Sequence, residues 1–226
     1  MRPASPPTSE AQLRDRADAI AGRSLAALAA EQRCAVPADL RRAKGWVGTL
    51  IEASLGADAG SRPVPDFRLI GVELKTVPVD RHGRPRESTY VCTVPLLARE
   101  APTWERSNVR RKLARVLWLP VEADPSLPIA ERRVGSALLW SPSADEEAAL
   151  RADWEELMDL ICLGHIDQIT ARNGTHLQIR PKAADSHARR LGVDALGRFR
   201  PTSPRGFYLR SRFTAALLAR HFVVAR

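Results

Sequence analysis

The sequence predicts a mixed α/β (α+β) domain in which helices flank a central mixed sheet. Helical and strand patterns alternate along the chain, because the spacing of apolar residues changes between about 3.6 and 2 residues. The 226 residues suit one domain with one or two lobes, and 44% hydrophobic residues are enough for a sizeable core. We therefore predict a flexible lead-in over residues 1–8 and a single two-lobed domain over residues 9–226.

Helices are predicted where a capping residue precedes an amphipathic run. Ser9 with Gln12 and Ser143 with Glu146 have the spacing of a capping box, in which two side chains satisfy free N–H groups at a helix start. Gly164 ends the helix that Ser143 begins. The predicted helices cover residues 9–21, 24–32, 38–56, 143–163 and 213–222, and Gly45 and Gly48 are expected to interrupt the third.

Strands are predicted where β-branched and aromatic residues alternate with polar ones. The turn-rich residues 80–85 join the first two strands, and Asn173 with Gly174 marks a turn before a later one. The predicted strands cover residues 72–76, 90–94, 113–121, 133–140, 175–180 and 207–210.

Several classes of protein lose support from what the sequence lacks. No apolar run reaches the roughly 18 residues of a membrane span, and residues 1–20 contain no hydrophobic signal segment. The three cysteines never form a C-x-x-C pair, so we expect a reduced, cytoplasmic protein with buried thiols. Motifs for phosphate-binding loops, dinucleotide binding, serine hydrolysis and zinc ligation are all missing.

Positive charge is concentrated towards the end of the chain. The net charge is +9, and residues 164–226 hold twelve Lys and Arg against three Asp, which accounts for the whole excess. A basic third beside a neutral remainder predicts a face for nucleic acid, with a merely solvated basic surface as the alternative. Lysine is rare among the 35 basic residues, so each lysine is a candidate for a role that needs a compact ammonium. The four lysines are Lys44, Lys75, Lys112 and Lys182.

One pattern of charged residues stands out within residues 66–75. Glu73 and Lys75 are two residues apart on a predicted strand, so both side chains project from one face while their neighbours enter the core. Gly71 permits a turn that would return Asp66 to the start of this strand. The sequence therefore predicts two carboxylates and an amine close together.

Such a group of side chains suits a hard metal ion. Two neighbouring carboxylates repel each other unless a cation lies between them, and Mg²⁺ prefers a few carboxylates plus water and phosphate oxygens. A bound ion would stabilise charge on a scissile phosphate, and the lysine could orient or deprotonate the attacking water. The D-x6-E-x-K pattern thus predicts a metal-dependent phosphodiesterase. The alternative is a strand edge on which Glu73 and Lys75 simply pair in solvent.

Longer motifs in the chain resemble the MutH family of mismatch-repair endonucleases. The resemblance runs from about residue 10 to the C-terminus, with divergence over residues 193–203. The motifs that carry it are Lys44–Gly48, Gly71–Asp80, Arg115–Glu122, Glu131–Ser136, Asp153–Met158 and Gln178–Lys182.

This resemblance implies a restriction-endonuclease-like PD-(D/E)xK fold whose two arms form a cleft for double-stranded DNA. It also implies a monomer that uses Mg²⁺ to nick the unmethylated strand of hemimethylated GATC, after activation by the mismatch-repair ATPase MutL. Two alternatives stay open: a stand-alone type II restriction endonuclease for GATC, and a DNA-binding module without catalytic activity.

The resemblance further implies roles for individual residues of the catalytic centre. Asp66 and Glu73 match metal-binding carboxylates, and Lys75 matches the lysine of the motif. Lys112 matches a further active-site lysine, and Glu52 matches a helical glutamate near the metal.

A second group matches positions that contact DNA. Lys44, Arg180 and Tyr208 belong to this group, and Lys182 is a candidate beside them. Tyr90, which stands where the best-known member has Phe, is also expected to contact DNA. The hydroxyl of Tyr208 could accept a hydrogen bond from the N6 amine of adenine and clash with a methyl group there.

Overall fold

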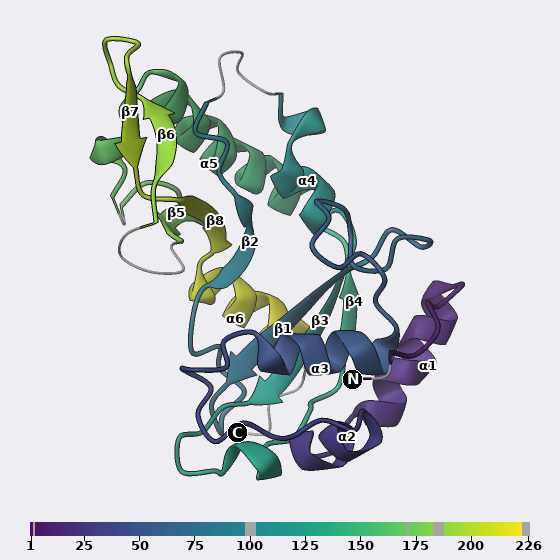
Figure 1. Cartoon of the computed structure of the whole chain (residues 1–226). Coiled ribbons are helices and arrows are strands. Elements are labelled where there is room, and N and C mark those ends of the chain that lie inside the picture. The colour runs from purple at the N-terminus through teal and green to yellow at the C-terminus, as the bar shows by residue number, and fades with distance from the viewer. Residues whose placement is uncertain (2, 98–102, 171, 183–187, 223–226) are drawn as a thin grey trace. The chain divides into compact units, whose positions relative to one another are not determined.

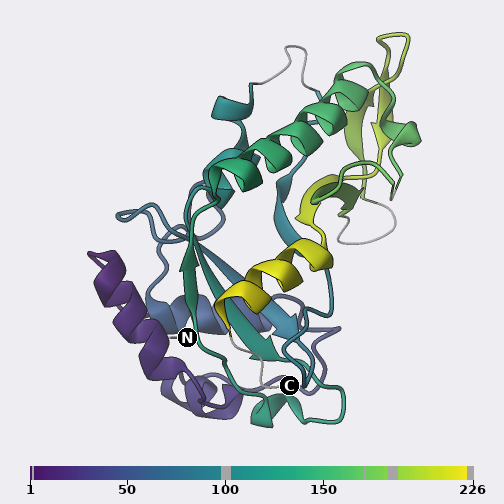
Figure 2. The ribbon, with the colours of Figure 1, turned by 180° about the vertical axis from the view of Figure 1, so that it is seen from behind.

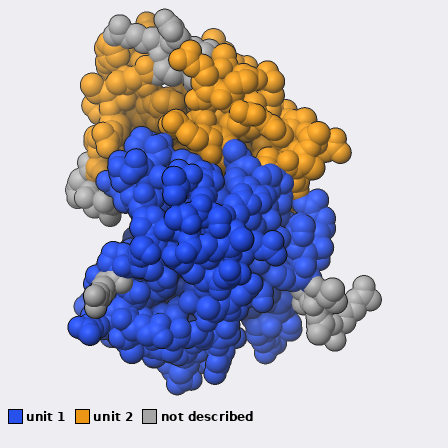
Figure 3. All heavy atoms as spheres, turned by 90° about the vertical axis from the view of Figure 1, so that its right-hand side faces the viewer, with its two compact units in different colours: residues 1–87, 114–141, 217–226 blue, residues 88–113, 142–216 orange. Residues whose placement is uncertain are grey.

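The computed structural model describes residue 1 and residues 3–97, 103–170, 172–182 and 188–222. It divides into two compact units, coloured blue and orange in Figure 3. Unit 1 consists of residues 1–87, 114–141 and 217–226, and unit 2 consists of residues 88–113 and 142–216. Both units combine helices with strands (Figures 1 and 2), which confirms the predicted mixed α/β class.

Unit 1 contains a three-stranded mixed sheet. Its strands are β1 (Glu73–Val79), β3 (Val116–Glu122) and β4 (Leu138–Trp140), in the order β1-β3-β4. β1 runs parallel to β3, with Glu73 opposite Val116, and β3 is antiparallel to β4. Residues 116–119 of β3 are all buried, as expected for a central strand covered on both faces.

Three helices enclose the apolar core of unit 1. They are α1 (Glu10–Ile20), α2 (Leu25–Glu31) and α3 (Trp46–Leu55), and a short 3₁₀ helix, η2, covers Ile129–Glu131. α3 packs against β1, which it crosses in Figure 1. Alternate residues of the strands, such as Leu74, Leu117 and Leu119, join the helices in this core. Burial of each such side chain stabilises the fold by about 1.5–3 kcal/mol, so β1 is firmly held on this face.

The start of the chain is bound to unit 1. The Ala4 N–H donates to the Ala53 carbonyl at 2.9 Å. At the start of α1 the Ser9 hydroxyl accepts from the Gln12 N–H at 3.1 Å, as predicted. The Gln12 side chain, however, accepts from the Thr8 N–H rather than from that of Ser9, so only half of the predicted capping box forms.

Unit 2 contains an antiparallel sheet, a separate hairpin and a long helix. The sheet has the order β2-β8-β5, and the hairpin is β6-β7. Helix α5 packs against β5 and η1. The elements are β2 (Thr89–Thr93), η1 (Trp104–Arg106), α4 (Asn108–Leu113), α5 (Ala144–Cys162), η3 (Ile166–Gln168), β5 (Leu177–Pro181), β6 (Arg190–Val193), β7 (Phe199–Thr202) and β8 (Arg205–Leu209). A last helix, α6 (Ser211–His221), begins in the residues of unit 2 and ends in those of unit 1.

Strand pairing differs from the prediction in its long-range partners. The β1-β3-β4 sheet is mixed and flanked by helices as predicted, but the other strands form two further sheets. β1 and β2, predicted as neighbours joined by a turn, pair with β3 and β8 instead. The strand predicted over residues 133–140 is shortened to β4, and Val134 makes only an isolated bridge to Val121.

Helix boundaries differ where backbone conformation is decisive. Within the range 38–56, α3 begins only at Trp46. The predicted interruption at Gly45 is confirmed by its left-handed φ of 83°, whereas the one predicted at Gly48 is wrong, since α3 continues through that residue. Residues 108–113 form α4, which the hydrophobic pattern did not predict, and the divergent residues 193–203 include β7.

Two further expectations concern burial and membranes. All three cysteines are free, but Cys162 is exposed and Cys34 is half-buried, so the expectation of three buried thiols is wrong for these two. Within the described residues, no helix has the length and apolar character required to cross a membrane.

Asp153 of α5 fixes the start of β5. Its side chain is 7% exposed. Its carboxylate accepts backbone N–H groups of Thr175, His176 and Leu177 at 2.7, 2.5 and 2.8 Å. Three donors that would otherwise lack partners are thereby satisfied, and the strand that carries Arg180 begins at a defined position on α5.

We expect Asp153→Ala to lower the free energy of unfolding by about 2–5 kcal/mol, because it leaves these three N–H groups without their acceptor. Urea unfolding measures the change. The matched control is Asp159→Ala on an exposed turn of the same helix, for which we expect a change within about 0.5 kcal/mol. Equal effects of the two substitutions would contradict the anchoring role of Asp153.

Candidate functional site

The segment before β1 folds back on itself in the way predicted from Gly71. Phe67 and Val72 form an antiparallel bridge, with the Phe67 N–H donating to the Val72 carbonyl at 2.9 Å. Gly71 has a φ of 67°, which favours glycine at this turn. The fold-back brings Asp66 to the start of β1, where its Oδ2 accepts from the Leu74 N–H at 2.8 Å. The Asp66 carboxylate therefore lies beside the residue that follows Glu73.

Glu73 and Lys75 form an ion pair on one face of β1. Glu73 Oε1 and Lys75 Nζ are 2.6 Å apart, and the two side chains are only 3% and 11% exposed. Val72 and Leu74 enter the core of unit 1, as strand alternation predicts. The alternative of a solvated pair at a strand edge is therefore wrong.

The burial of this pair has a chemical meaning. Removing two charges from water costs several kcal/mol per ion, and their mutual attraction rarely gives more than it costs. A buried ion pair is therefore a poor device for stabilising a fold, whereas buried charged groups beside a further carboxylate are typical of catalytic sites.

Glu52 lies on α3, on the part of the helix near β1. A Cβ atom added at Gly48, one turn earlier, would lie 3.9 Å from Glu52 Oε1 and 4.0 Å from the Thr76 hydroxyl. The carboxylate of Glu52 and the hydroxyl of Thr76 thus border the same small space beside Gly48. Lys44 precedes Gly45, the residue before α3, and its side chain is exposed.

The donor chemistry of unit 1 fits a hard divalent ion. Asp66 and Glu73 offer carboxylate oxygens at the start of β1, and Mg²⁺ commonly takes one or two protein carboxylates together with water and phosphate oxygens. Over the described ranges, no three His, Cys, Asp or Glu side chains gather closely enough to hold a metal ion. Glu52 therefore does not complete a three-ligand group in this structure, and its metal contact stays a prediction.

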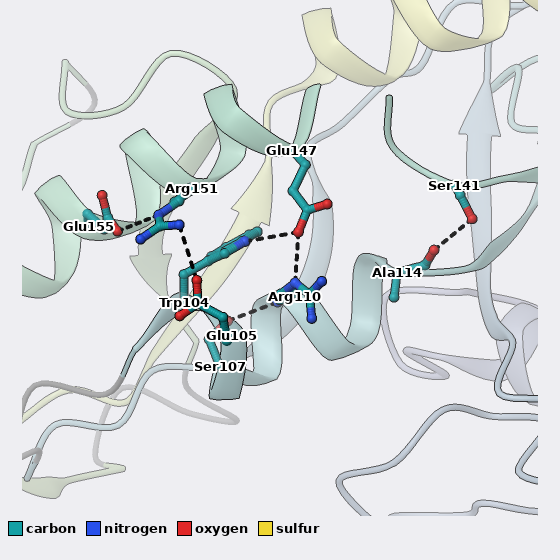
Figure 4. Close-up of polar contacts among 9 residues, drawn as sticks. All are labelled: Trp104, Glu105, Ser107, Arg110, Ala114, Ser141, Glu147, Arg151 and Glu155. Carbon is teal, nitrogen blue, oxygen red and sulfur yellow. Dashed lines mark hydrogen bonds and ion pairs between the residues drawn. The ribbon is translucent and has the colours of Figure 1, made fainter. Parts of the chain in front are cut away.

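Lys112 lies in unit 2, on the short helix α4. Figure 4 shows how α4 and the preceding η1 are attached to α5. Glu147 of α5 accepts from Trp104 Nε1 at 3.2 Å and from Arg110 Nε at 2.7 Å. A second link joins Arg151 to Glu105 at 3.1 Å. A six-residue helix is too short to be stable alone, so these links determine where the backbone of Lys112 lies.

Electrostatics strengthen the Glu147 link. The hydrogen bond from Arg110, and then that from Trp104, lowers the pKa of the Glu147 carboxyl. A lowered carboxyl pKa means that the link is present above the ordinary carboxyl pKa and is lost as the pH falls through the lowered value.

Four of the five residues expected to contact DNA meet on one face of the β2-β8-β5 sheet. The rings of Tyr90 and Tyr208 are in edge-to-face contact, with centroids 5.3 Å apart. Lys182 Nζ lies 3.0 Å from the centroid of Tyr90, and Arg180 Cζ lies 5.9 Å from that of Tyr208. Ser88 accepts from Arg180 Nη1 at 3.4 Å. Cations alternating with aromatic rings are typical of surfaces that bind nucleic acid.

Sequence reasoning missed several residues that hold this site. Trp104 and Glu147 gave no signal, because their contact joins segments 43 residues apart. Asp153 begins one of the motifs that carry the family resemblance, but its three acceptor contacts depend on the packing of α5 on β5.

Comparisons with known proteins all identify the same family. The family model described as DNA mismatch repair enzyme MutH matches residues 55–153. The DNA mismatch repair protein MutH of Serratia proteamaculans is 57% identical over 219 residues, which cover 97% of this chain and 96% of that protein. That of Klebsiella pneumoniae is 57% identical over 221 residues, covering 98% and 96%. That of Escherichia coli is 56% identical over 220 residues, covering 97% and 96%.

The turn at Gly71 provides a test of the arrangement at β1. A Cβ atom at Gly71 meets nothing within 4 Å, so the cost of Gly71→Ala is the left-handed backbone alone, about 1 kcal/mol or 2–4 °C in Tm. We expect endonuclease activity to fall about tenfold, because Asp66 shifts relative to Glu73. Gly83→Ala is the control: Gly83 has a φ of 72° and equally open surroundings. Equal losses of activity in the two variants would show an effect of stability alone.

Proposed function

The chain belongs to the MutH family of DNA mismatch repair endonucleases, and we propose that it uses Mg²⁺ to nick the unmethylated strand of hemimethylated GATC. The observation that supports this proposal is that the Asp66 carboxylate accepts from the Leu74 N–H, between the two strand positions that carry the buried Glu73 and Lys75 pair. Nucleases of this family need a divalent metal, and the two carboxylates offer the oxygen ligands that Mg²⁺ prefers.

The protein groups have separable roles in this mechanism. A bound ion would supply stabilisation of the scissile phosphate and activation of a water molecule. Asp66 and Glu73 would hold that ion, and Glu73 also fixes the position of the Lys75 amine. As the ammonium of this ion pair, Lys75 neutralises charge that develops on the phosphate; to take a proton from the water it must first lose one of its own. Lys112 and Glu52 are proposed to assist, on the basis of the resemblance.

DNA recognition is assigned to the sheet face of unit 2 and to Lys44. Arg180 and Lys182 supply positive charge for phosphates or guanine. The amine of Lys182 packs on the ring of Tyr90. Tyr208 faces the N6 position of adenine in the major groove, where it accepts a hydrogen bond from the unmethylated amine and excludes a methyl group. Contacts with phosphates alone could not distinguish the two strands, because the phosphates of a methylated and an unmethylated strand are the same.

The cellular setting follows from the family. We propose that the protein acts as a monomer in the cytoplasm and is activated by MutL with ATP. A stand-alone restriction endonuclease for GATC would cut both strands without MutL. A binding module without catalytic activity has no need for a buried carboxylate and amine beside Asp66.

Nicking of a supercoiled plasmid with hemimethylated GATC tests the proposed function. We expect Glu73→Gln to reduce the nicking rate at least about 100-fold, because removal of a carboxylate ligand weakens charge stabilisation at the phosphate. The amide retains the shape of the buried side chain, so the melting temperature and DNA affinity show whether the fold survives. Glu122→Gln on the neighbouring strand β3 is the matched control and should nick at the parental rate.

Three outcomes of the plasmid assay distinguish the alternatives. Slow nicking that MutL and ATP accelerate supports the proposal, and linear plasmid formed without MutL would indicate a restriction endonuclease. Nicking that Glu73→Gln leaves unchanged, or that persists after chelation of the metal, would contradict the proposed mechanism.

Methylation discrimination tests the role of Tyr208. We expect Tyr208→Phe and Tyr208→Ser to nick fully methylated GATC at least about tenfold faster relative to hemimethylated GATC than the parent does, since a good contact to a base edge discriminates by about 1–3 kcal/mol. Initial rates on the two plasmids give the ratio. An unchanged ratio in both variants would remove Tyr208 from methyl recognition.

A further inference from the structure

Gly206 of β8 lies where two aromatic rings leave no room for a side chain. A Cβ atom at this position would lie 2.9 Å from Tyr90 Cε2 and 3.1 Å from Tyr208 Cε2. It would also lie 3.3 Å from Tyr90 Cδ2. Carbon atoms in ordinary contact are about 3.5–4.0 Å apart, so an alanine would collide with both rings at once.

The backbone itself does not require glycine here. Gly206 is absent from the described glycines that have a positive φ. It pairs with Arg180 of β5 and with Thr93 of β2, next to a register shift between Tyr90 and Cys92. An L-residue can adopt this strand conformation without strain. The reason for glycine is therefore space above the sheet rather than backbone freedom.

The space above Gly206 determines the position of Tyr208. Gly206 and Tyr208 are two residues apart on β8, so they share the face opposite the buried Phe207. The Tyr208 ring leans back along the strand over Gly206, and Tyr90 closes over the same point from β2. Both rings can therefore take these positions because Gly206 has no Cβ atom.

The same rings also position the basic side chains. Lys182 lies over Tyr90 at 3.0 Å from its centroid, and Arg180 lies 5.9 Å from that of Tyr208. A shift of either ring therefore moves a cation as well as a hydroxyl. We propose that Gly206 is a specificity-determining position. It determines how Tyr208 and Tyr90 contact the adenine of GATC that carries or lacks the methyl group. This inference rests on the proposed function and deepens it.

Gly206→Ala tests the proposal through the ratio of the nicking rates on hemimethylated and fully methylated GATC. We expect the preference for hemimethylated over fully methylated GATC to fall about tenfold, because a displacement of the order of 1 Å strongly impairs a positioned contact. Duplex affinity, measured by fluorescence anisotropy, should fall several-fold as Lys182 and Arg180 move. A loss of stability alone reduces both nicking rates together and leaves their ratio unchanged.

Gly192→Ala is a matched control. Gly192 also lies in a strand of unit 2 without a positive φ, and a Cβ atom there would lie 2.9 Å from Thr202 Cγ2. The shortest contact is the same as at Gly206, but it lies in the β6-β7 hairpin and involves one side chain rather than two. We expect its methylation ratio to equal that of the parent. The proposal is overturned if Gly206→Ala keeps the parental ratio or if Gly192→Ala changes it equally.

A double variant keeps the test decisive should Gly206→Ala fold poorly. Tyr90→Ala removes two of the three close contacts, so Gly206→Ala should change the ratio less in that background than in the parent. Equal changes in both backgrounds would overturn the proposal. A parental enzyme that shows no preference between the two plasmids would instead reject the proposed function, so the two failures are distinguishable.

Discussion

The buried ion pair between Glu73 and Lys75 is the constraint around which unit 1 is organised. Two charges can lie out of water only if each satisfies the other and the surrounding structure holds them together. β1 provides this because its alternation sends Glu73 and Lys75 to one face and Val72 and Leu74 into the core. The apolar core therefore acts on the chemistry indirectly, by fixing the strand that carries the charges.

The fold-back at Gly71 adds the second carboxylate at little energetic cost. A left-handed glycine reverses the chain within a few residues, and the Asp66 carboxylate is then oriented by the backbone N–H of Leu74. One Asp66 oxygen is engaged in this way. A backbone contact thus orients the Asp66 carboxylate at the start of β1.

Local chemistry could be predicted from the sequence, and long-range packing could not. The return of Asp66 followed from Gly71, and the shared face of Glu73 and Lys75 followed from strand alternation, because both depend on neighbouring residues. The burial of the pair did not follow, since it depends on α3 and β3 packing around β1. The separation of β1 and β2 into different sheets and the contact of Trp104 with Glu147 were likewise set by distant partners.

The proposed catalytic residues of β1 and the proposed DNA-contacting residues of the β2-β8-β5 sheet depend on different sheets, although Lys112 of unit 2 and Lys44 of unit 1 do not follow this division. Asp66, Glu73 and Lys75 depend on the core of unit 1, whereas Tyr90, Arg180, Lys182 and Tyr208 depend on the β2-β8-β5 sheet of unit 2. Substitutions that disturb β1 should therefore act mainly on the chemical step, and those that disturb β8 should act on affinity and on the choice between strands. Since the two groups share no strand, their effects on the transition state are expected to be additive unless the bound DNA itself couples them. Deviation from additivity then becomes a measure of how far recognition of the base contributes to catalysis.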